Sequence, residues 1–268
     1  MKRFALIGKN IKKSLSPAIH QYCFEQLSLG AKYEIINIKR SDKISGVIDQ
    51  LKSGDLDGVN VTTPYKEDVN LFLNHINPRA EQIGSINCIH VKSGKLIGNN
   101  TDWYGFLKAL EGIEGFNNVV IFGTGGVVPA ILYYFNSRET MPVHIVGRNK
   151  KKMSFFQSKG FSTYDIKNLN VNIDNPLIIN TIPSNASINW KDLINKVSNN
   201  VCAAMDLNYN FKVTEFLNSF NSDVKTKNGL DMLIYQALMS LDIWYEKDLS
   251  NSINVNDLKS NIKEIYYE

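Results

Sequence analysis

Apolar segments of strand length alternate with segments of helical periodicity along almost the whole chain. This alternation predicts an α/β fold built on largely parallel sheets. We expect strands at residues 4–7, 33–38, 58–62, 86–91, 95–97, 119–122, 143–146, 177–180 and 203–207. We expect helices from residue 16 onward and at residues 44–51, 103–110, 129–135, 230–245 and 255–266.

The strands fall into two groups, which predicts two compact units. The first group ends with a hairpin about Ser93-Gly94, and the second begins near Asn118. A chain of 268 residues commonly splits in this way, and 43% hydrophobic residues suffice for buried cores. The first helix should start at Ser16, whose hydroxyl can cap the free amides, and should stop at Gly30.

Composition argues against several functional classes. The net charge of +4 comes from scattered lysines with no basic stripe, so we expect no nucleic-acid partner. The apolar run of residues 1–8 is too short for a signal peptide, and no stretch approaches the roughly 20 apolar residues of a membrane span. Three cysteines without paired spacing predict reduced thiols in a cytoplasmic protein, and four histidines without ligand spacing predict no metal.

A glycine-rich turn follows the predicted strand 119–122. In Gly123-Thr124-Gly125-Gly126 the first glycine permits a tight turn, and the second lets the backbone approach a pyrophosphate in front of helix amides. Val128 occupies the usual third glycine position, so an ordinary tight turn is the alternative. The context favours a Rossmann-type dinucleotide-binding domain.

The end of the following strand carries a basic turn, Gly147-Arg148-Asn149-Lys150. An NAD enzyme commonly has an acidic residue here, whereas a guanidinium makes forked hydrogen bonds to a phosphate. Arg148 therefore favours NADP(H) as cofactor, and a solvated basic turn is the alternative.

Small polar clusters mark strand ends and turns of the first unit, where α/β sheets build their sites. They supply hydroxyls, amides, one ammonium and one carboxylate, a set that suits a small ligand with many hydroxyl groups. The clusters are residues 14–20, 60–66, 86–87 and 98–102.

Eight motifs resemble the shikimate dehydrogenase family, occur in the family's order and span nearly the whole chain. They are Ser14-Leu-Ser-Pro17, Gly58-Val-Asn-Val-Thr-Thr-Pro-Tyr-Lys66, Ile86-Asn87, Asn99-Asn-Thr-Asp102, Gly123-Thr-Gly-Gly126, Asn180-Thr-Ile-Pro183, Asp206-Leu-Asn-Tyr209 and Gly229-Leu-Asp-Met-Leu-Ile-Tyr-Gln236. The resemblance implies a substrate domain over 1–103, to which C-terminal helices of 229–268 return, and a Rossmann-type NADP domain over 104–228.

The resemblance also implies reversible, NADPH-dependent reduction of 3-dehydroshikimate to shikimate in aromatic amino-acid biosynthesis. Lys66 and Asp102 are then the catalytic pair. The implied substrate contacts are Ser14, Ser16 and Thr62 at the carboxylate, Asn60, Asn87, Asp102 and Gln236 at ring hydroxyls, and Lys66 and Tyr209. The implied cofactor contacts are Gly123, Thr124, Gly125, Gly126, Val127, Gly147, Arg148, Asn149, Lys150, Thr181, Ile182, Pro183, Leu207 and Gly229.

Carbonyl chemistry supports the catalytic pair independently. Hydride arriving at a carbonyl carbon leaves alkoxide charge on oxygen, and this charge must be stabilised and protonated. The Lys66 ammonium can do both, and Asp102 can orient the lysine and a substrate hydroxyl. The alternatives are a surface position for Lys66, a capping role for Asp102 in the helix from Trp103, and a solvent-facing Gln236; His20 is expected to be structural.

Two other functions stay open. In quinate/shikimate dehydrogenases with relaxed cofactor use a threonine often replaces a serine at the carboxylate site, whereas Ser14 and Ser16 are both serine here. A non-catalytic protein that senses dinucleotides or shikimate-like metabolites would be free to lose Lys66 and Asp102, which this chain retains. The expected partners are small molecules, with no membrane or nucleic acid, and the chain is expected to be a monomer or homodimer.

Overall fold

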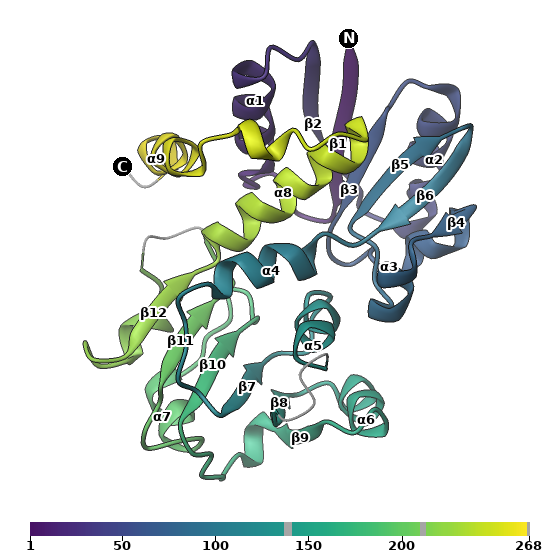
Figure 1. Ribbon diagram of the computed structural model, residues 1–268. Helices are drawn as coiled ribbons and strands as arrows, with labels where there is room; N and C mark the ends of the chain where they lie inside the picture. The colour runs from purple at the N-terminus through teal and green to yellow at the C-terminus, as the bar shows by residue number, and fades with distance from the viewer. Residues whose placement is uncertain (137–140, 210–212, 267–268) are drawn as a thin grey trace. The chain divides into compact units, whose positions relative to one another are not determined.

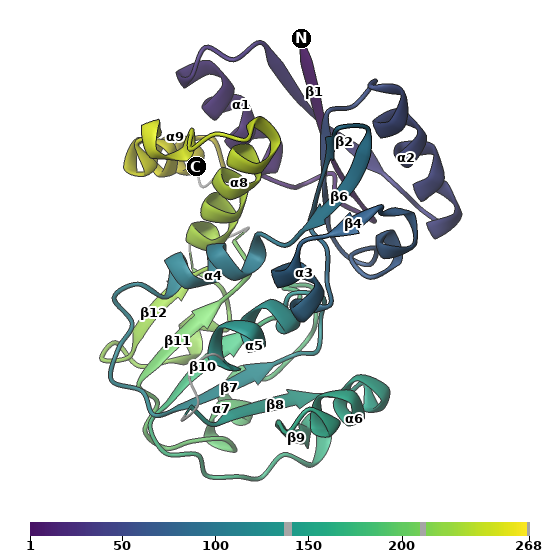
Figure 2. The same cartoon turned by 45° about the vertical axis from the view of Figure 1, so that its right-hand side comes forward.

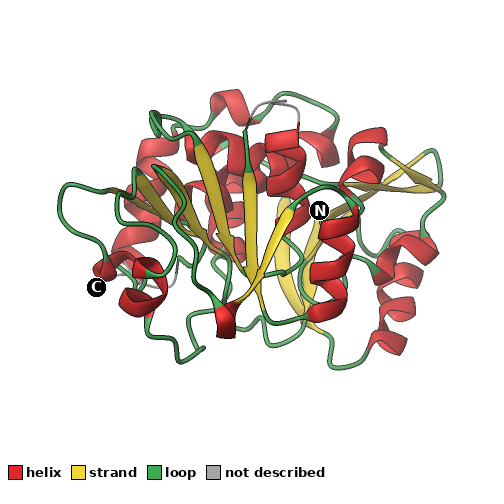
Figure 3. Cartoon of the chain, turned by 90° about the horizontal axis from the view of Figure 1, so that it is seen from below, coloured by secondary structure: helices red, strands yellow, loops and turns green. Residues whose placement is uncertain are grey.

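The chain forms two compact units, and the described strands of each make one six-stranded sheet (Figure 1). The computed structural model describes residues 1–136, 141–209 and 213–266. Unit 1 comprises Met1–Lys108 and Met232–Tyr266, and unit 2 comprises Ala109–Asp231. Helices and strands alternate in both units (Figure 3), so the predicted α/β class is confirmed.

The sheet of unit 1 has the strand order β2-β1-β3-β5-β6-β4. Its first three strands in this order are parallel, whereas β3, β5 and β6 are antiparallel neighbours. The strands are β1 (Lys2–Gly8), β2 (Ala31–Asn37), β3 (Gly58–Val61), β4 (His75–Ile76), β5 (Cys88–Lys92) and β6 (Lys95–Asn99). The predicted hairpin between β5 and β6 turns through left-handed backbone at Ser93 and Gly94.

Helices cover both faces of this sheet. Ala5 and Ile7 of β1 pack with the apolar side chains of α2 (Ile44–Ser53). On the opposite face Phe4 stacks on Trp244 of α8 (Leu230–Tyr245), with 4.4 Å between ring centroids. Figure 2 shows α2 on one side of the sheet, and α1 (Ser16–Gln26) with α8 on the other. The other helices that lie in or start from this unit are α3 (Pro78–Ile83), α4 (Asp102–Leu110) and α9 (Val255–Tyr266).

The described strands of unit 2 are all parallel, in the order β12-β11-β10-β7-β8-β9. This is the order of the doubly wound dinucleotide-binding fold, in which ligands bind where the order reverses, here between β7 and β10. The strands are β7 (Asn118–Phe122), β8 (Val143–Gly147), β9 (Ser162–Asp165), β10 (Pro176–Asn180), β11 (Ala203–Asp206) and β12 (Lys225–Asn228). The helices are α5 (Val128–Asn136), α6 (Lys150–Ser158) and α7 (Trp190–Asn195).

Two predicted details of the first helix are wrong. Helix α1 starts at Ser16 after Leu15, and the Ser16 hydroxyl does not cap it: this hydroxyl faces Ser14 Oγ at 3.2 Å, and Ser14 Oγ accepts the Ser16 N–H at 3.3 Å. The helix ends at Gln26, and the left-handed residue that follows it is Ser28, with φ of 51°, rather than Gly30.

Candidate active site

Lys66 and Asp102 form a buried ion pair within unit 1. Lys66 Nζ lies 2.5 Å from Asp102 Oδ2, and the two side chains are 10% and 9% exposed. Lys66 lies in the turn after β3, where its carbonyl accepts the Ile86 N–H at 2.9 Å, and Asp102 is the first residue of α4. The structure therefore brings together the residues predicted as a catalytic pair, and a surface position for Lys66 is excluded.

Asp102 uses both carboxylate oxygens for side-chain contacts. Oδ2 accepts from Lys66, and Oδ1 accepts from Nδ2 of Asn87 at 2.8 Å. The Asp102 N–H donates to Oδ1 of Asn100 at 2.9 Å. Donors from two different segments thus fix the orientation of the carboxylate.

The β5–β6 hairpin places Asn87 beside the segment that leads into α4. Cys88 pairs with Asn99, and the Asn87 N–H donates to the Asn99 carbonyl at 3.0 Å. Asn87 Oδ1 accepts the Thr101 N–H at 2.6 Å, while Nδ2 donates to Thr101 Oγ1 at 2.9 Å and to Asp102. Both amide hydrogens of Asn87 are therefore used inside the protein, so a ligand finds an acceptor there and no donor.

Asn60 of β3 is also saturated as a donor. Its Nδ2 donates to the Asn87 carbonyl at 3.1 Å and to Ser240 Oγ at 2.9 Å, and its Oδ1 accepts from the Tyr33 hydroxyl at 2.9 Å. The side chain is buried and links β2, β3 and α8. For the predicted contact with a substrate hydroxyl, this geometry leaves only the amide oxygen.

Gln236 is buried on α8, so the solvent-facing alternative is excluded. Its Nε2 donates to the Leu233 carbonyl at 2.8 Å, and its Oε1 lies 3.5 Å from Thr101 Oγ1. Helix α4 approaches α8 closely at Gly105, where a Cβ atom would lie 2.5 Å from the Met232 carbonyl oxygen and 3.0 Å from Gln236 Cβ. Glycine at this position permits the packing that brings Gln236 next to Thr101.

Three predicted carboxylate ligands also lie in unit 1. The hydroxyls of Ser14 and Ser16 are 3.2 Å apart at the start of α1. Thr62 follows β3, donates its N–H to the Ile7 carbonyl at 2.9 Å, and packs so closely on Gly8 that a Cβ atom there would lie 2.5 Å from Thr62 Cγ2. Hydroxyls can donate to a carboxylate without adding charge. The remaining predicted substrate contact, Tyr209, belongs to unit 2 and stays a prediction.

The glycine turn after β7 lies at the carboxyl ends of the parallel strands, where the sequence predicts a pyrophosphate. Gly123 has a left-handed φ of 113°, and its N–H donates to the Val146 carbonyl at 2.8 Å. At Gly125 nothing beyond the chain neighbours lies within 4 Å of the position a Cβ would take, so this face of the turn is open. Helix α5 then starts at Val128, whose N–H donates to the Gly125 carbonyl at 3.1 Å, and Pro129 after it has no N–H. The same turn contains Thr124, Gly126 and Val127.

The basic turn after β8 is exposed at Arg148, Asn149 and Lys150. Asn149 caps α6, because its Oδ1 accepts the Lys152 N–H at 3.1 Å. Gly147 packs on the glycine turn, where a Cβ would lie 2.7 Å from the side chain of Thr124. An exposed guanidinium beside a helix N-terminus suits a phosphate group.

A buried polar network joins Asn180 at the end of β10 to Asp206 at the end of β11. Asp206 accepts from Thr214 Oγ1 at 2.5 Å, from Asn180 Nδ2 at 3.0 Å and from the Asn208 N–H at 3.0 Å. Burial raises the pKa of Asp206, and these hydrogen bonds oppose the rise. Asn180 Oδ1 in turn accepts the Ile182 N–H at 2.9 Å. The predicted cofactor contacts of this region are Thr181, Ile182, Pro183, Leu207 and Gly229.

Three polar side chains of the unit 1 network were not predicted as site residues, namely Tyr33, Thr101 and Ser240. Ser240 lies one helical turn after Gln236, so the shared face of α8 was the available signal. Thr101 lies inside the motif Asn99-Asn-Thr-Asp102, which was the available signal, whereas Tyr33 carried none.

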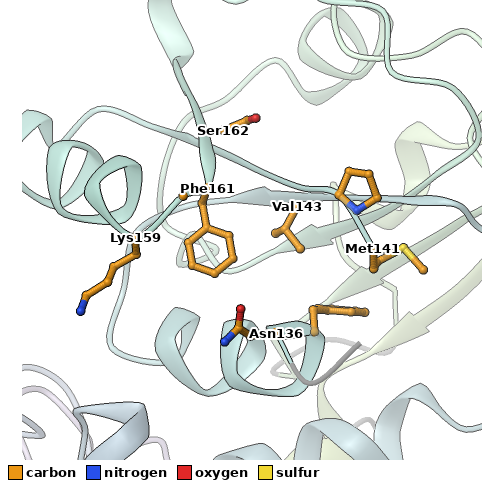
Figure 4. Close-up of a pocket in the computed structure, with 9 residues that line it drawn as sticks. Asn136, Met141, Val143, Lys159, Phe161 and Ser162 are labelled. Atoms are coloured by element: carbon orange, nitrogen blue, oxygen red, sulfur yellow. The ribbon is translucent and has the colours of Figure 1, made fainter. Parts of the chain in front are cut away.

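A separate pocket of about 300 Å³ lies in unit 2 (Figure 4). Its lining includes Phe135, Val143, Phe161 and Lys159. Val143 is the first residue of β8, so the pocket lies at the amino ends of the parallel strands, whereas the glycine turn lies at their carboxyl ends. The pocket is therefore not part of the candidate active site.

Residues 1–136, 141–209 and 213–266 contain neither a cluster of metal ligands nor a membrane-spanning helix. No group of three or more His, Cys, Asp or Glu side chains in these ranges could hold a metal ion. No helix of the described chain has the length and apolar character needed to cross a membrane.

Comparison with known proteins gives one consistent result. Residues 6–89 match the family model of the shikimate dehydrogenase substrate binding domain. The chain is 35% identical to the shikimate dehydrogenase (NADP(+)) of Clostridium perfringens, with 100% of this chain and 98% of the relative covered. It is similar to the crystal structure of shikimate dehydrogenase 1 from Peptoclostridium difficile, with a TM-score of 0.81, 32% identity, and coverage of 98% and 99% of the two chains. It is also similar to the Thermus thermophilus shikimate 5-dehydrogenase solved with NADP(H) and shikimate, with a TM-score of 0.79, 25% identity, and coverage of 97% and 100%.

Proposed function

The chain belongs to the shikimate dehydrogenase family, and on that premise we propose that it catalyses the reversible, NADPH-dependent reduction of 3-dehydroshikimate to shikimate. The observation that carries the proposal is the buried contact of 2.5 Å between Lys66 and Asp102. A protein that only senses a metabolite has no need for a desolvated ammonium–carboxylate pair, whose burial is costly.

Lys66 acts on the oxygen of the reacting carbon. NADPH, when bound, supplies the hydride that reduces this carbon. The Lys66 ammonium donates a hydrogen bond to the ketone oxygen, stabilises the negative charge that develops there, and transfers a proton to it. In the oxidation direction the neutral amine accepts the proton of the shikimate hydroxyl. Since Lys66 is 8% exposed, little water competes for either hydrogen bond.

Asp102 positions the ammonium and one substrate hydroxyl. Its Oδ2 receives Lys66 and its Oδ1 receives Asn87, and each carboxylate oxygen has a further lone pair for a substrate hydroxyl. Asn87 offers a substrate only its amide oxygen, because both amide hydrogens are donated to protein atoms. Gln236, next to Thr101, completes the set of groups for ring hydroxyls.

The substrate carboxylate binds to the hydroxyls of Ser14, Ser16 and Thr62. The chemistry of these side chains supports this assignment. Three neutral donors lie in the same unit as Lys66 and can bind a carboxylate without a second buried cation. Unit 1 is accordingly the substrate-binding unit, and unit 2 is the cofactor-binding unit.

The residues of unit 2 fit NADP. The open face at Gly125 admits the pyrophosphate, and the exposed Arg148 guanidinium suits the 2′-phosphate. We place the protein in the cytoplasm, where thiols stay reduced, because the three cysteines of the described chain are free. We propose that it is a monomer or a homodimer.

The test is a steady-state assay of the purified protein, in which absorbance of the reduced nicotinamide is followed with shikimate and NADP. We expect turnover with this pair and a higher kcat/KM than with quinate or with NAD. Ligand-induced stabilisation without turnover would instead support the metabolite-sensing protein, and equal use of quinate and NAD would support the relaxed quinate/shikimate enzyme.

A further inference from the structure

We infer that Ser240 is a positioning residue of the active site, which acts through Asn60 and Thr101 on the side chains that hold the catalytic pair. The inference rests on the proposed function. Ser240 is fully buried on α8, and none of the motifs that indicate the family includes it.

Ser240 closes a continuous chain of side-chain contacts across unit 1. One arm runs from Ser240 to Asn60 at 2.9 Å and on to the Tyr33 hydroxyl at 2.9 Å. The other arm begins with the 3.3 Å contact between Ser240 Oγ and Thr101 Oγ1. From Thr101 it continues through Asn87, at 2.9 Å, to Asp102 and Lys66. The helix α8 is thereby connected to both asparagines at the strand ends.

The direction of each hydrogen bond follows from counting protons. The single Ser240 proton is donated to the Gln236 carbonyl at 2.9 Å, and Ser240 Oγ accepts from Asn60 Nδ2. Ser240 therefore has no proton for Thr101, so a hydrogen bond across the 3.3 Å contact between them must be donated by Thr101. Thr101 Oγ1 accepts from Asn87 on its other side.

This direction matters for Gln236. The Thr101 proton has two competing acceptors, Asn87 Oδ1 at 3.3 Å and Gln236 Oε1 at 3.5 Å. While Ser240 accepts that proton, Gln236 Oε1 is left to accept from a substrate hydroxyl. Loss of the Ser240 hydroxyl leaves one buried hydrogen of Asn60 without an acceptor and lets Thr101 turn toward Gln236. We then expect weaker substrate binding and a less well fixed hydrogen bond between Asn87 and Asp102.

The experiment is a double-mutant cycle of Ser240→Ala and Thr101→Val, read as kcat/KM for shikimate and KM for NADP. We expect Ser240→Ala to lower kcat/KM roughly three- to tenfold, the factor that corresponds to one lost hydrogen bond, with KM for NADP unchanged. In the Thr101→Val background the same substitution should have a clearly smaller effect, because one of the two partners through which Ser240 acts is already gone.

The matched control is Ser198→Ala. Ser198 is also buried, but it lies in unit 2 and its hydroxyl bonds Asn200, so we expect loss of thermal stability without loss of kcat/KM. If Ser240→Ala melts below the assay temperature, Ser240→Cys, which keeps the side-chain volume, takes its place in the cycle.

The outcomes separate the inference from the proposed function. An inactive wild-type protein overturns both. An active wild type with unaltered kcat/KM in Ser240→Ala overturns the inference alone, and so do losses that multiply independently of Thr101, since these indicate a purely structural serine. Coupled losses in an otherwise folded protein support it.

Discussion

Acid should destabilise the folded chain through His20. This imidazole is fully buried, stacks on Tyr33 with 4.3 Å between ring centroids, and has no hydrogen-bond partner at either ring nitrogen within the described residues. Burial lowers the pKa of His20 from 6.5 to about 3, and the neighbouring Asn60 amide opposes this only in part. The His20 imidazole is therefore neutral in the folded chain at pH values at which it is protonated in the unfolded chain.

The size of the effect follows from these two pKa values. Between pH 6.5 and pH 3 the unfolded state binds one more proton at this residue, so each pH unit of acidification lowers the free energy of unfolding by about 1.4 kcal/mol. The contribution is fully present above pH 6.5. At pH 5, 1.5 pH units lower, about 2 kcal/mol is lost, and over the whole interval the loss reaches about 5 kcal/mol.

The assay compares the wild type with His20→Phe, which keeps an aromatic ring against Tyr33 and cannot titrate. Urea unfolding at several pH values between 7 and 5 gives the free energy of unfolding of each protein. We expect the wild type to lose about 2 kcal/mol more than the variant over this range. Asp206, whose pKa burial raises, titrates in both proteins and cancels in the difference. Parallel curves for the two proteins would refute the assignment of a buried neutral imidazole.

Three further substitutions have defined outcomes. Arg148→Ala should raise KM for NADP roughly tenfold or more, with little change for NAD, because only the 2′-phosphate loses a charged partner; equal effects on the two cofactors would remove Arg148 from that role. Gly125→Ala should weaken cofactor binding in titrations while thermal melting stays near wild type, since the added Cβ fills an open face and meets no protein atom within 4 Å beyond its chain neighbours; unchanged NADP binding would contradict this. Gly105→Ala should lower the free energy of unfolding by about 1–3 kcal/mol, because the added Cβ would lie 2.5 Å from the Met232 carbonyl oxygen; a stabilised variant would show that helix propensity outweighs packing.

Long periodic elements were predictable from sequence because their burial pattern repeats. The predicted bounds 230–245 and 255–266 agree with α8 and α9. The short strand β12 was missed, since Lys-Thr-Lys-Asn has no apolar run and pairs only as an edge strand. The start of α1 at Ser16 was predicted correctly, but the cap was not, because the Ser16 hydroxyl faces Ser14 Oγ, a contact that capping statistics do not anticipate.

Site residues could be predicted from sequence where they belong to a motif with a known chemical role. Contacts between residues far apart in the sequence could not be predicted. Lys66 and Asp102 were expected to meet, and they lie 2.5 Å apart. The contact between Asn60 and Ser240 joins residues 180 positions apart, so the sequence pattern around either residue does not predict it. The donor saturation of Asn60 and Asn87 likewise appears only once their partners are known.

The central claim is that Lys66 and Asp102 act as one unit in proton transfer, and a kinetic cycle of Lys66→Ala, Asp102→Ala and the double variant tests it most directly. We expect Lys66→Ala to lower kcat by roughly 10²–10⁴ with a much smaller effect on NADP affinity, and the double variant to be scarcely slower than the worse single variant. Wild-type turnover in Lys66→Ala, or losses that multiply in the double variant, would contradict it.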